Sequence, residues 1–183
     1  MDSDPGNKLL GLPPTLIRTI KQGLQRAVGD QAADVLQEAG FASGDELYHA
    51  FKSWLTTRTD LGQPEDLDSG LLGEMLSSFF ADLGWGTLIV ERLSPAALSM
   101  ASENWAEPEA TGESDVPACY ITTGFLAALL GKLAQDVVAV MEVECRSRGD
   151  HSCRFLVGSP TTLQAVFEGM SRGSDYRSVL TPA

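Results

Sequence analysis

The chain has 183 residues, 43% of them apolar, and its 25 acidic and 13 basic side chains give a formal net charge of −12. This length and composition predict one globular domain with a substantial core. The sequence has no run of about 18 consecutive apolar residues, and its N-terminus is acidic, so we expect a cytoplasmic protein without a membrane span. The acidic balance argues against nucleic acid or an anionic bilayer as a partner.

The N-terminal third is expected to be helical. Residues 1–8 are polar and predict a disordered tail, whereas residues 9–58 carry three apolar patterns at helical spacing. The expected helix starts are, in order, Pro13-Pro14, Asp30, and the capping-box pair Ser43 and Glu46. A linker over residues 59–69, which contains glycine, proline and acids, then separates elements of the same domain.

Residues 70–170 predict the main part of the domain, and residues 171–183 predict a second disordered tail. Apolar periodicity predicts helices over 71–83, 120–134 and 160–170, and strands over 87–93, 97–102, 137–145 and 152–157. The order ααα-α-ββ-α-ββ-α, with strands joined as hairpins, indicates the α+β class, with a four-stranded antiparallel sheet covered by helices.

The segment from Glu103 to Val116 is acidic and is expected to be a mobile loop. Its Trp105 either anchors the loop on the body of the protein or forms a lid or partner contact. The acids of this segment are expected to be a solvated charge run; they are Glu103, Glu107, Glu109, Glu113 and Asp115.

The informative polar residues are the three cysteines and one glutamate. A hairpin that turns symmetrically about Gly149 places Cys145 opposite Cys153, with Cβ atoms about 4.5 to 5.5 Å apart, which is close enough to share a tetrahedral metal. Cys119, at the start of the central helix, can supply a third sulfur. Glu142 would complete four ligands, but it needs a bulge or strand end to face the same side as Cys145.

Spacing alone leaves three interpretations of these cysteines open. They form a zinc site, they are inert core thiols, or Cys145 and Cys153 form a cross-strand disulfide while Cys119 stays a buried thiol. A site with four protein ligands has no open position and would be structural. Its formal charge of −2 would attract nearby donors, and the candidates are Arg146, Arg148, Arg154 and His151.

A family resemblance rests on Cys119, Gly124, Gly131, Val138, the segment Glu142-Val-Glu-Cys145, Gly149 and Cys153-Arg-Phe155, preceded by Gly84-Trp85-Gly86. This pattern resembles the 4-vinyl reductase domain, also called the hydrocarbon-binding domain. The family includes a bacteriochlorophyll-biosynthesis protein and sensory domains of aromatic-responsive transcription activators, and its fold is shared with TRAPP subunits. The resemblance is close over residues 70–158 and loose over the N-terminal helices.

The resemblance implies a structural Zn²⁺ held by Cys119, Glu142, Cys145 and Cys153. It also implies an apolar ligand pocket between the central helix, the sheet and the preceding helices. We place around that pocket Phe51, Trp54, Phe79, Phe80, Trp85, Leu98, Met100, Tyr120, Phe125 and Val140. Sensory members anchor a phenol through a histidine and a tryptophan, whereas the matching strand here reads Ala96-Ala97-Leu98, a departure that favours an apolar or larger ligand.

Three classes of function follow from these observations. The first is a stand-alone, zinc-stapled domain that binds or senses a small hydrophobic or aromatic ligand. The second is a 4-vinyl reductase of a bacteriochlorophyll precursor, or a carrier in tetrapyrrole assembly; the sequence contains no dinucleotide-binding glycine motif, which disfavours the reductase itself. The third is a TRAPP-like assembly module.

The resemblance also implies a homodimer, formed through the N-terminal helices and their apolar positions Leu9, Leu10 and Leu12. A sensor of this length would need a separate signalling partner for its output.

Overall fold

The computed structural model describes residues 9, 11–109 and 114–181. The helices are α1 (Pro14–Val28), α2 (Gln31–Ala42), α3 (Gly44–Arg58), α4 (Ser69–Asp82), α5 (Tyr120–Ala134), α6 (Pro160–Ser171) and α7 (Tyr176–Leu180), with the short 3-10 helices η1 (Pro64–Asp66) and η2 (Arg146–Arg148). The strands are β1 (Ile89–Ser94), β2 (Ala97–Ser102), β3 (Ala139–Glu144) and β4 (Cys153–Gly158). The predicted α+β class and element order are confirmed, with α7 as an addition.

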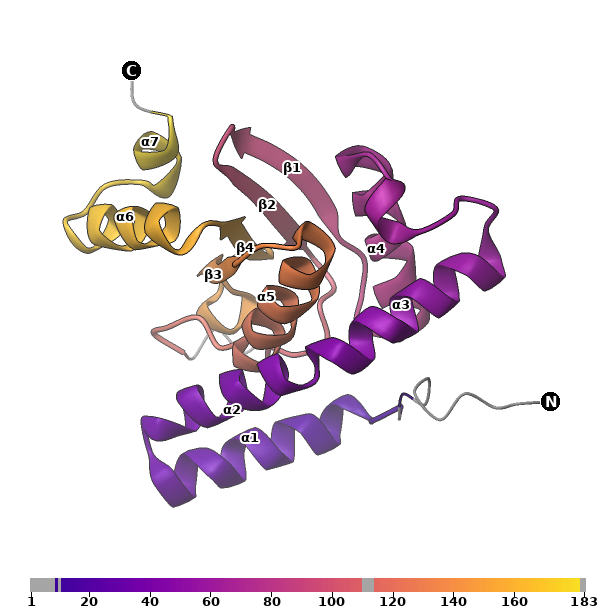
Figure 1. Ribbon diagram of the computed structural model, residues 1–183. Coiled ribbons are helices and arrows are strands. Elements are labelled where there is room, and N and C mark those ends of the chain that lie inside the picture. Colours follow the sequence, from indigo (N-terminus) through magenta and orange to yellow (C-terminus); the bar gives the residue numbers. More distant parts are fainter. Residues whose placement is uncertain (1–8, 10, 110–113, 182–183) are drawn as a thin grey trace.

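The four strands form one antiparallel sheet in the order β1-β2-β4-β3. The helix α5 lies across one face of the sheet, with α2 and α3 beyond it, whereas α6 and α7 lie on the other side (Figure 1). The expectation that α5 is central follows from its nearly uniform apolar composition, and the structure agrees, since α5 packs against α2, α3 and β3.

Glycines allow α2 and α5 to approach closely. A Cβ atom on Gly124 of α5 would lie 2.1 Å from the backbone oxygen of Gln37, and one on Gly40 of α2 would lie 2.2 Å from the backbone oxygen of Ile121. Side chains at these positions would hold the helices apart, so the contact depends on glycine. This contact places the N-terminal end of α5, where Cys119 lies, at a defined position over the sheet.

Two helix starts differ in how they match the expectation. The Ser43 hydroxyl bonds back to the oxygen of Gly40 and makes no cap for α3, so the predicted capping box is wrong. In contrast, the Ser159 hydroxyl accepts from the backbone N–H of Thr162 and caps α6 as predicted.

The C-terminal segment, expected to be disordered from residue 171, instead folds back as α7. Tyr176 is buried against the outer face of the sheet, and its hydroxyl donates to Glu144 at 2.9 Å. The sequence analysis missed this helix because five residues are too few for a recognisable period. Residues 1–8 and 182–183, the rest of the two expected tails, lie outside the described residues.

Candidate functional site

Four side chains from three parts of the fold converge at the N-terminal end of α5. Cys119 immediately precedes α5, Glu142 lies on β3, Cys145 follows β3, and Cys153 begins β4. One ligating atom of each lies within 4.8 Å of those of the others. The fold therefore brings together the four residues that the sequence analysis selected.

A bulge in β3 allows Glu142 and Cys145 to face the same side. Glu142 pairs with Phe155, whereas Glu144 pairs with Arg154, so Val143 is an extra residue in the strand. In a regular strand two residues three positions apart point to opposite faces, and the extra residue corrects this. The bulge also explains the register: the symmetric pairing predicted about Gly149 holds next to the turn and is shifted by one residue beyond Val143.

The sulfur positions match the geometry of a tetrahedral thiolate site. Cys119 Sγ lies 3.9 Å from Cys145 Sγ and 3.8 Å from Cys153 Sγ. Two sulfurs bound to one tetrahedral zinc at about 2.3 Å are separated by about 3.8 Å. All three cysteines are free and buried, so the structure contains no disulfide between Cys145 and Cys153.

The Glu142 carboxylate has one oxygen that lacks a partner. Its Oε2 accepts from the backbone N–H of Cys119 at 2.9 Å, whereas Oε1 is buried without any hydrogen-bond partner among the described residues. A buried unpaired carboxylate oxygen is costly, and such groups are usually explained by a bound ion or by water. The donor set and this orphaned oxygen together fit a Zn²⁺ ion.

Electrostatic interactions within the metal-free cluster oppose full ionisation. Burial, followed by hydrogen bonds with the other two thiols, raises the pKa of Cys119 well above its usual value. Burial, followed by the negative charge of Cys145, raises the pKa of Glu142 to about 8. Hydrogen bonds with Cys119 and Cys153 instead lower the pKa of Cys145. The cluster therefore favours a single thiolate, because four adjacent negative charges require a cation to coexist.

Backbone groups and a serine supply the hydrogen bonds around the cluster. The backbone N–H groups of Ala118 and Arg146 donate to Cys145 and Cys153 respectively, and the Ser147 hydroxyl lies 3.0 Å from Cys145 Sγ. These contacts come from the segment before α5 and from η2, so local backbone geometry surrounds the sulfurs.

The arginine and histidine side chains expected as donors to the cluster make other contacts. Arg146 donates to the backbone oxygen of Trp105, and Arg148 to Asp150 and to the Val143 oxygen. Arg154 pairs with Glu144 on the outer face of the sheet, where neighbouring strand residues alternate away from Cys153. His151 is exposed and pairs with Glu103. The expectation is wrong for the arginines because it assumed proximity in sequence to be proximity in space.

The loop before α5 is anchored rather than mobile over residues 103–109. The Trp105 side chain is 1% exposed, and its indole N–H donates to the Thr122 hydroxyl at 2.7 Å. This confirms the interpretation of Trp105 as a loop anchor. Residues 110–113, including Glu113, lie outside the described residues.

Glu107 is a buried helix cap, not part of a solvated charge run. Its carboxylate accepts from the backbone N–H groups of Ile121 and Thr122, at 3.0 and 2.8 Å, and pairs with Lys21 of α1 at 3.2 Å. The carboxylate thereby satisfies the unpaired donors at the first turn of α5. Sequence patterns missed this cap because Glu107 lies thirteen positions before Tyr120, the first residue of α5.

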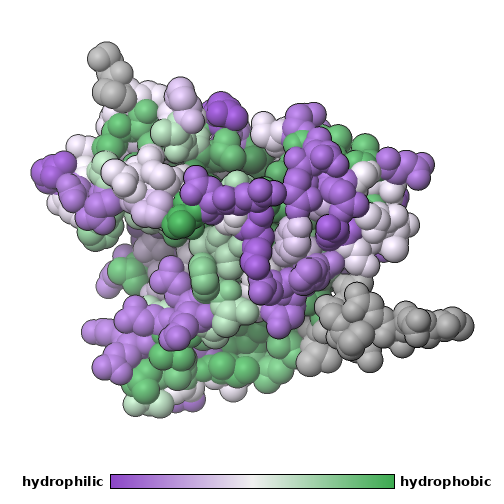
Figure 2. All heavy atoms as spheres, viewed as in Figure 1, coloured by the Kyte–Doolittle hydropathy of each residue, from purple (hydrophilic) through white to green (hydrophobic). Residues whose placement is uncertain are grey.

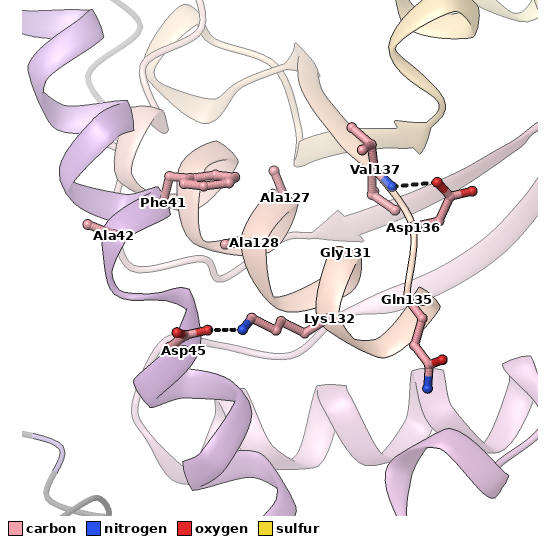
Figure 3. Close-up of a pocket in the computed structure, with 11 residues that line it drawn as sticks. Phe41, Ala42, Asp45, Ala127, Ala128, Gly131, Lys132, Gln135, Asp136 and Val137 are labelled. Carbon is pink, nitrogen blue, oxygen red and sulfur yellow. Dashed lines mark hydrogen bonds and ion pairs between the residues drawn. The ribbon is translucent and has the colours of Figure 1, made fainter.

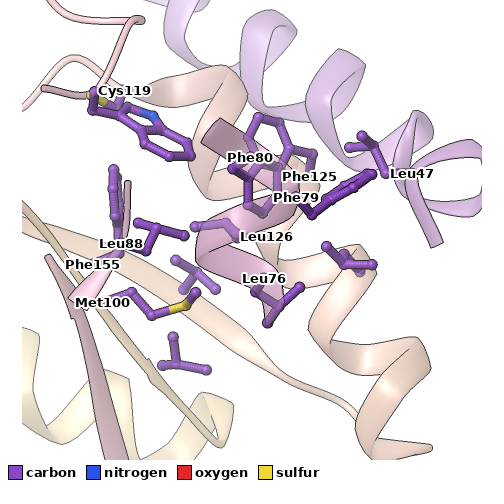
Figure 4. Close-up of a cluster of buried hydrophobic side chains, with 14 of the residues drawn as sticks. Leu47, Leu76, Phe79, Phe80, Leu88, Met100, Cys119, Phe125, Leu126 and Phe155 are labelled. Carbon is purple, nitrogen blue, oxygen red and sulfur yellow. The ribbon is translucent and has the colours of Figure 1, made fainter. Parts of the chain in front are cut away.

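The ten residues predicted to surround a ligand pocket lie mostly in the main core. The buried members are Phe51, Phe79, Phe80, Met100, Phe125 and Val140; Trp54, Trp85 and Leu98 pack against them, and Tyr120 is half-buried (Figure 4). Their rings are in mutual contact: Phe80 stacks on Phe125 at 5.5 Å between ring centroids, and Trp85 meets Phe125 edge-on at 5.0 Å. In this structure these side chains fill the space between α5, α4 and the sheet.

Comparison with known proteins agrees with the geometry of the cluster. Residues 98–159, which include all four cluster residues, match the model of the 4-vinyl reductase domain. The resemblance to the 4-vinyl reductase family is confirmed. The bacteriochlorophyll synthase 23 kDa chain of Cereibacter sphaeroides is 28% identical over 153 residues, covering 82% of this chain and 72% of the relative. An uncharacterized protein of Methanocaldococcus jannaschii is 32% identical over 82 residues, but the match covers only 45% of this chain and 44% of that protein.

Solved structures similar to this chain share its fold, and the similarity extends beyond the matched family segment. The phenol-responsive sensory domain of the transcription activator PoxR, solved with phenol, is 17% identical, with a TM-score of 0.60 over 96% of this chain and 85% of that one. A vinyl-4-reductase family protein from M. jannaschii gives 0.54 at 19% identity, over 83% and 84%. A trafficking protein particle complex subunit 3 from Naegleria fowleri gives 0.61 at 16% identity, over 79% and 91%.

No helix in the described part of the chain is long and apolar enough to cross a membrane.

Proposed function

We propose that this chain is a 4-vinyl reductase domain that is held together by a structural zinc ion and binds a small apolar or aromatic molecule. The single observation that carries the zinc part is the convergence of three thiols and one unsatisfied carboxylate oxygen within 4.8 Å. The family match and the phenol in the PoxR structure support the ligand part.

The zinc would act as a cross-link and not as a reaction centre. Cys119, Glu142, Cys145 and Cys153 would occupy all four positions, which leaves no place for an activated water. The ion would join the start of α5 to both strands of the β3–β4 hairpin, and its formal charge with these ligands would be −2. A structural zinc of this type contributes on the order of 10 kcal/mol to folding.

Native mass spectrometry with metal analysis tests the zinc directly. We expect one zinc per chain in the wild-type protein and little or none in Glu142→Gln, which keeps the size of the side chain and removes the ionised ligand. Glu144→Gln is the matched control, because Glu144 is two residues away and bonds Arg154 and Tyr176 outside the cluster. Equal zinc content in the two variants would refute the assignment of Glu142.

The ligand would enter the aromatic core next to the zinc site. The aromatic cluster that includes Phe80, Trp85, Trp105 and Phe125 begins beside Cys119, so a bound ligand would lie near the cross-linked end of α5. Because these rings fill the space here, binding would require them to rotate or separate. The absence of a histidine at Ala96-Ala97-Leu98 favours a ligand with more apolar surface than phenol.

A ligand panel tests this part separately. We would titrate naphthalene, phenol, palmitate and protoporphyrin, the last because of the bacteriochlorophyll synthase relative, and follow the quenching of tryptophan fluorescence. Phe125→Trp adds volume at the centre of the cluster and should abolish binding, whereas Phe167→Trp, on an exposed position of α6, should not. Equal binding by both variants would place the ligand elsewhere.

We also propose that the protein is a homodimer formed through α1. Three apolar side chains of this region are exposed, namely Leu12, Leu16 and Ile20 at 51, 42 and 51%, and hydrophobic side chains gather along the lower edge of the molecule where α1 lies (Figure 2). Leu9 is 38% exposed, and Leu10 lies outside the described residues. Sedimentation should give a dimer for the wild type and a monomer for Ile20→Glu; a wild-type monomer at micromolar concentration would contradict the proposal.

A further inference from the structure

A surface groove between α2 and α5 is separate from the zinc cluster and from the aromatic core. Its larger part has a volume of about 710 Å³, and a second part of about 330 Å³ shares Phe41 and Ala127 with the first. Phe41 from α2 and Ala127 from α5 face each other across it (Figure 3).

The groove has an apolar lining that is exposed to solvent. The Phe41 side chain is 58% exposed and that of Val137 is 71% exposed, and Ala127, Gly131 and Val138 lie between them. Exposed large apolar side chains gathered in one concave patch mark an interaction site more often than isolated ones do.

The charged residues around the groove are predominantly acidic. Asp34 and Glu38 line the smaller part, and Asp45 and Asp136 line the larger one. The one basic residue among the described lining residues, Lys132, is already paired with Asp45. The C-terminal end of α5 adds partial negative charge at the same place. The groove therefore complements a partner that is both apolar and positively charged.

The spacing of the lining residues indicates an elongated partner. Asp34, Glu38, Phe41 and Asp45 are four, three and four positions apart, so they follow one side of α2 and the start of α3. From Asp34 to Ala42 this side extends about 12 Å at 1.5 Å per residue, which is about the length of two helical turns. An amphipathic helix that binds such a groove presents apolar residues at i, i+4 and i+7.

We propose that this groove binds a basic amphipathic helix of a separate protein. The helix would place apolar side chains between Phe41 and Val137 and lysine or arginine side chains against Glu38 and Asp136. Such a partner is a candidate for the output of the domain, although the proposal requires neither zinc nor a small ligand.

The α1 helix of a second copy fits this groove less well. It is the chain's own basic amphipathic helix, but Lys21 is bonded to Glu107 and to the Ala118 oxygen, and Arg18 is paired with Glu109. Two of its three basic side chains are thus used within their own chain. Two copies, each with a net charge of −12, would also repel each other at an acidic groove.

The test uses the full chain and a fluorescein-labelled amphipathic peptide of about 15 residues, with leucines at i, i+4, i+7 and i+11 and lysines at the remaining positions. Fluorescence anisotropy would be measured at about 0.15 M salt, where long-range charge attraction is screened. We expect saturable binding, about tenfold weaker for Phe41→Ser. Phe167→Ser is the matched control, because Phe167 is 57% exposed on α6.

Charge is tested with a second matched pair. Glu38→Gln should weaken binding about threefold, whereas Glu46→Gln, at an exposed position outside the groove, should leave it unchanged. Equal weakening in both members of a pair would show non-specific attraction to an acidic protein, and no binding at 1 mM peptide would also overturn the proposal. If Phe41→Ser instead turns a dimer into a monomer, the occupant is a second copy and the proposal is wrong.

Discussion

The glycine contact between α2 and α5 allows a quantitative test of the packing that positions the metal site. In Gly124→Ala the added Cβ would lie 2.1 Å from the oxygen of Gln37 and 2.7 Å from the nitrogen of Phe41. Both are backbone atoms of α2, so no side chain can rotate away, and real Cβ contacts essentially never lie under 3.0 Å. The two helices must therefore separate by nearly an ångström along their contact.

The expected cost follows from two opposing terms. Overpacking in a rigid core costs about 1–3 kcal/mol, and a clash with backbone belongs at the upper end of that range. Alanine gains about 1 kcal/mol over glycine in a helix interior. The net loss in unfolding free energy should be about 2 kcal/mol, which lowers the melting temperature by about 4–8 °C in a domain of this size.

Gly23→Ala in α1 is the control, because its Cβ would meet only the end of the Arg26 side chain, at 3.9 Å. It should raise the unfolding free energy by up to about 1 kcal/mol. Urea and thermal denaturation of the zinc-loaded proteins would measure both. If the two variants have the same stability, α2 and α5 are not in the close contact described above.

Three further predictions concern the site and the elements around it. Because burial raises the pKa of Glu142 to about 8 in the metal-free protein, its protonated form contributes stability that is complete below the usual value of 4.5 and is lost as the pH rises towards 8. The melting temperature of chelator-treated, reduced protein should therefore fall between pH 5 and 8.5 by more than that of Glu142→Gln, and equal pH profiles would contradict the assigned environment. Glu107→Gln should cost about 2–3 kcal/mol in urea denaturation, since the carboxylate caps α5 and pairs with Lys21, whereas Glu109→Gln, a partly exposed pair with Arg18, should cost less than about 1 kcal/mol; the reverse order would remove Glu107 from its proposed role. Tyr176→Phe should cost about 1 kcal/mol and speed proteolytic cleavage within residues 171–181, and unchanged cleavage would show that the hydroxyl bond to Glu144 does not hold α7 in place.

The sequence alone was sufficient for the class, the element order and the four cluster residues. Apolar periodicity is a local property, and it placed α5 and the strands to within a few residues. The two thiols of the hairpin could be paired because Cys145 and Cys153 are related by a short turn about Gly149. Cys119 and Glu142 were then assigned to the same site by their number, chemistry and family spacing.

Only the tertiary structure decided the features that depend on contacts between distant segments. The bulge at Val143 turns Glu142 towards the thiols, and no residue type in β3 indicates it. Glu107 and Trp105 are buried because the loop folds over the start of α5, although the same residues in an acidic stretch predict exposure. The groove beside Phe41 likewise exists because glycines draw α2 onto α5, and a helical pattern read along one segment contains no information about the surface that a second helix completes.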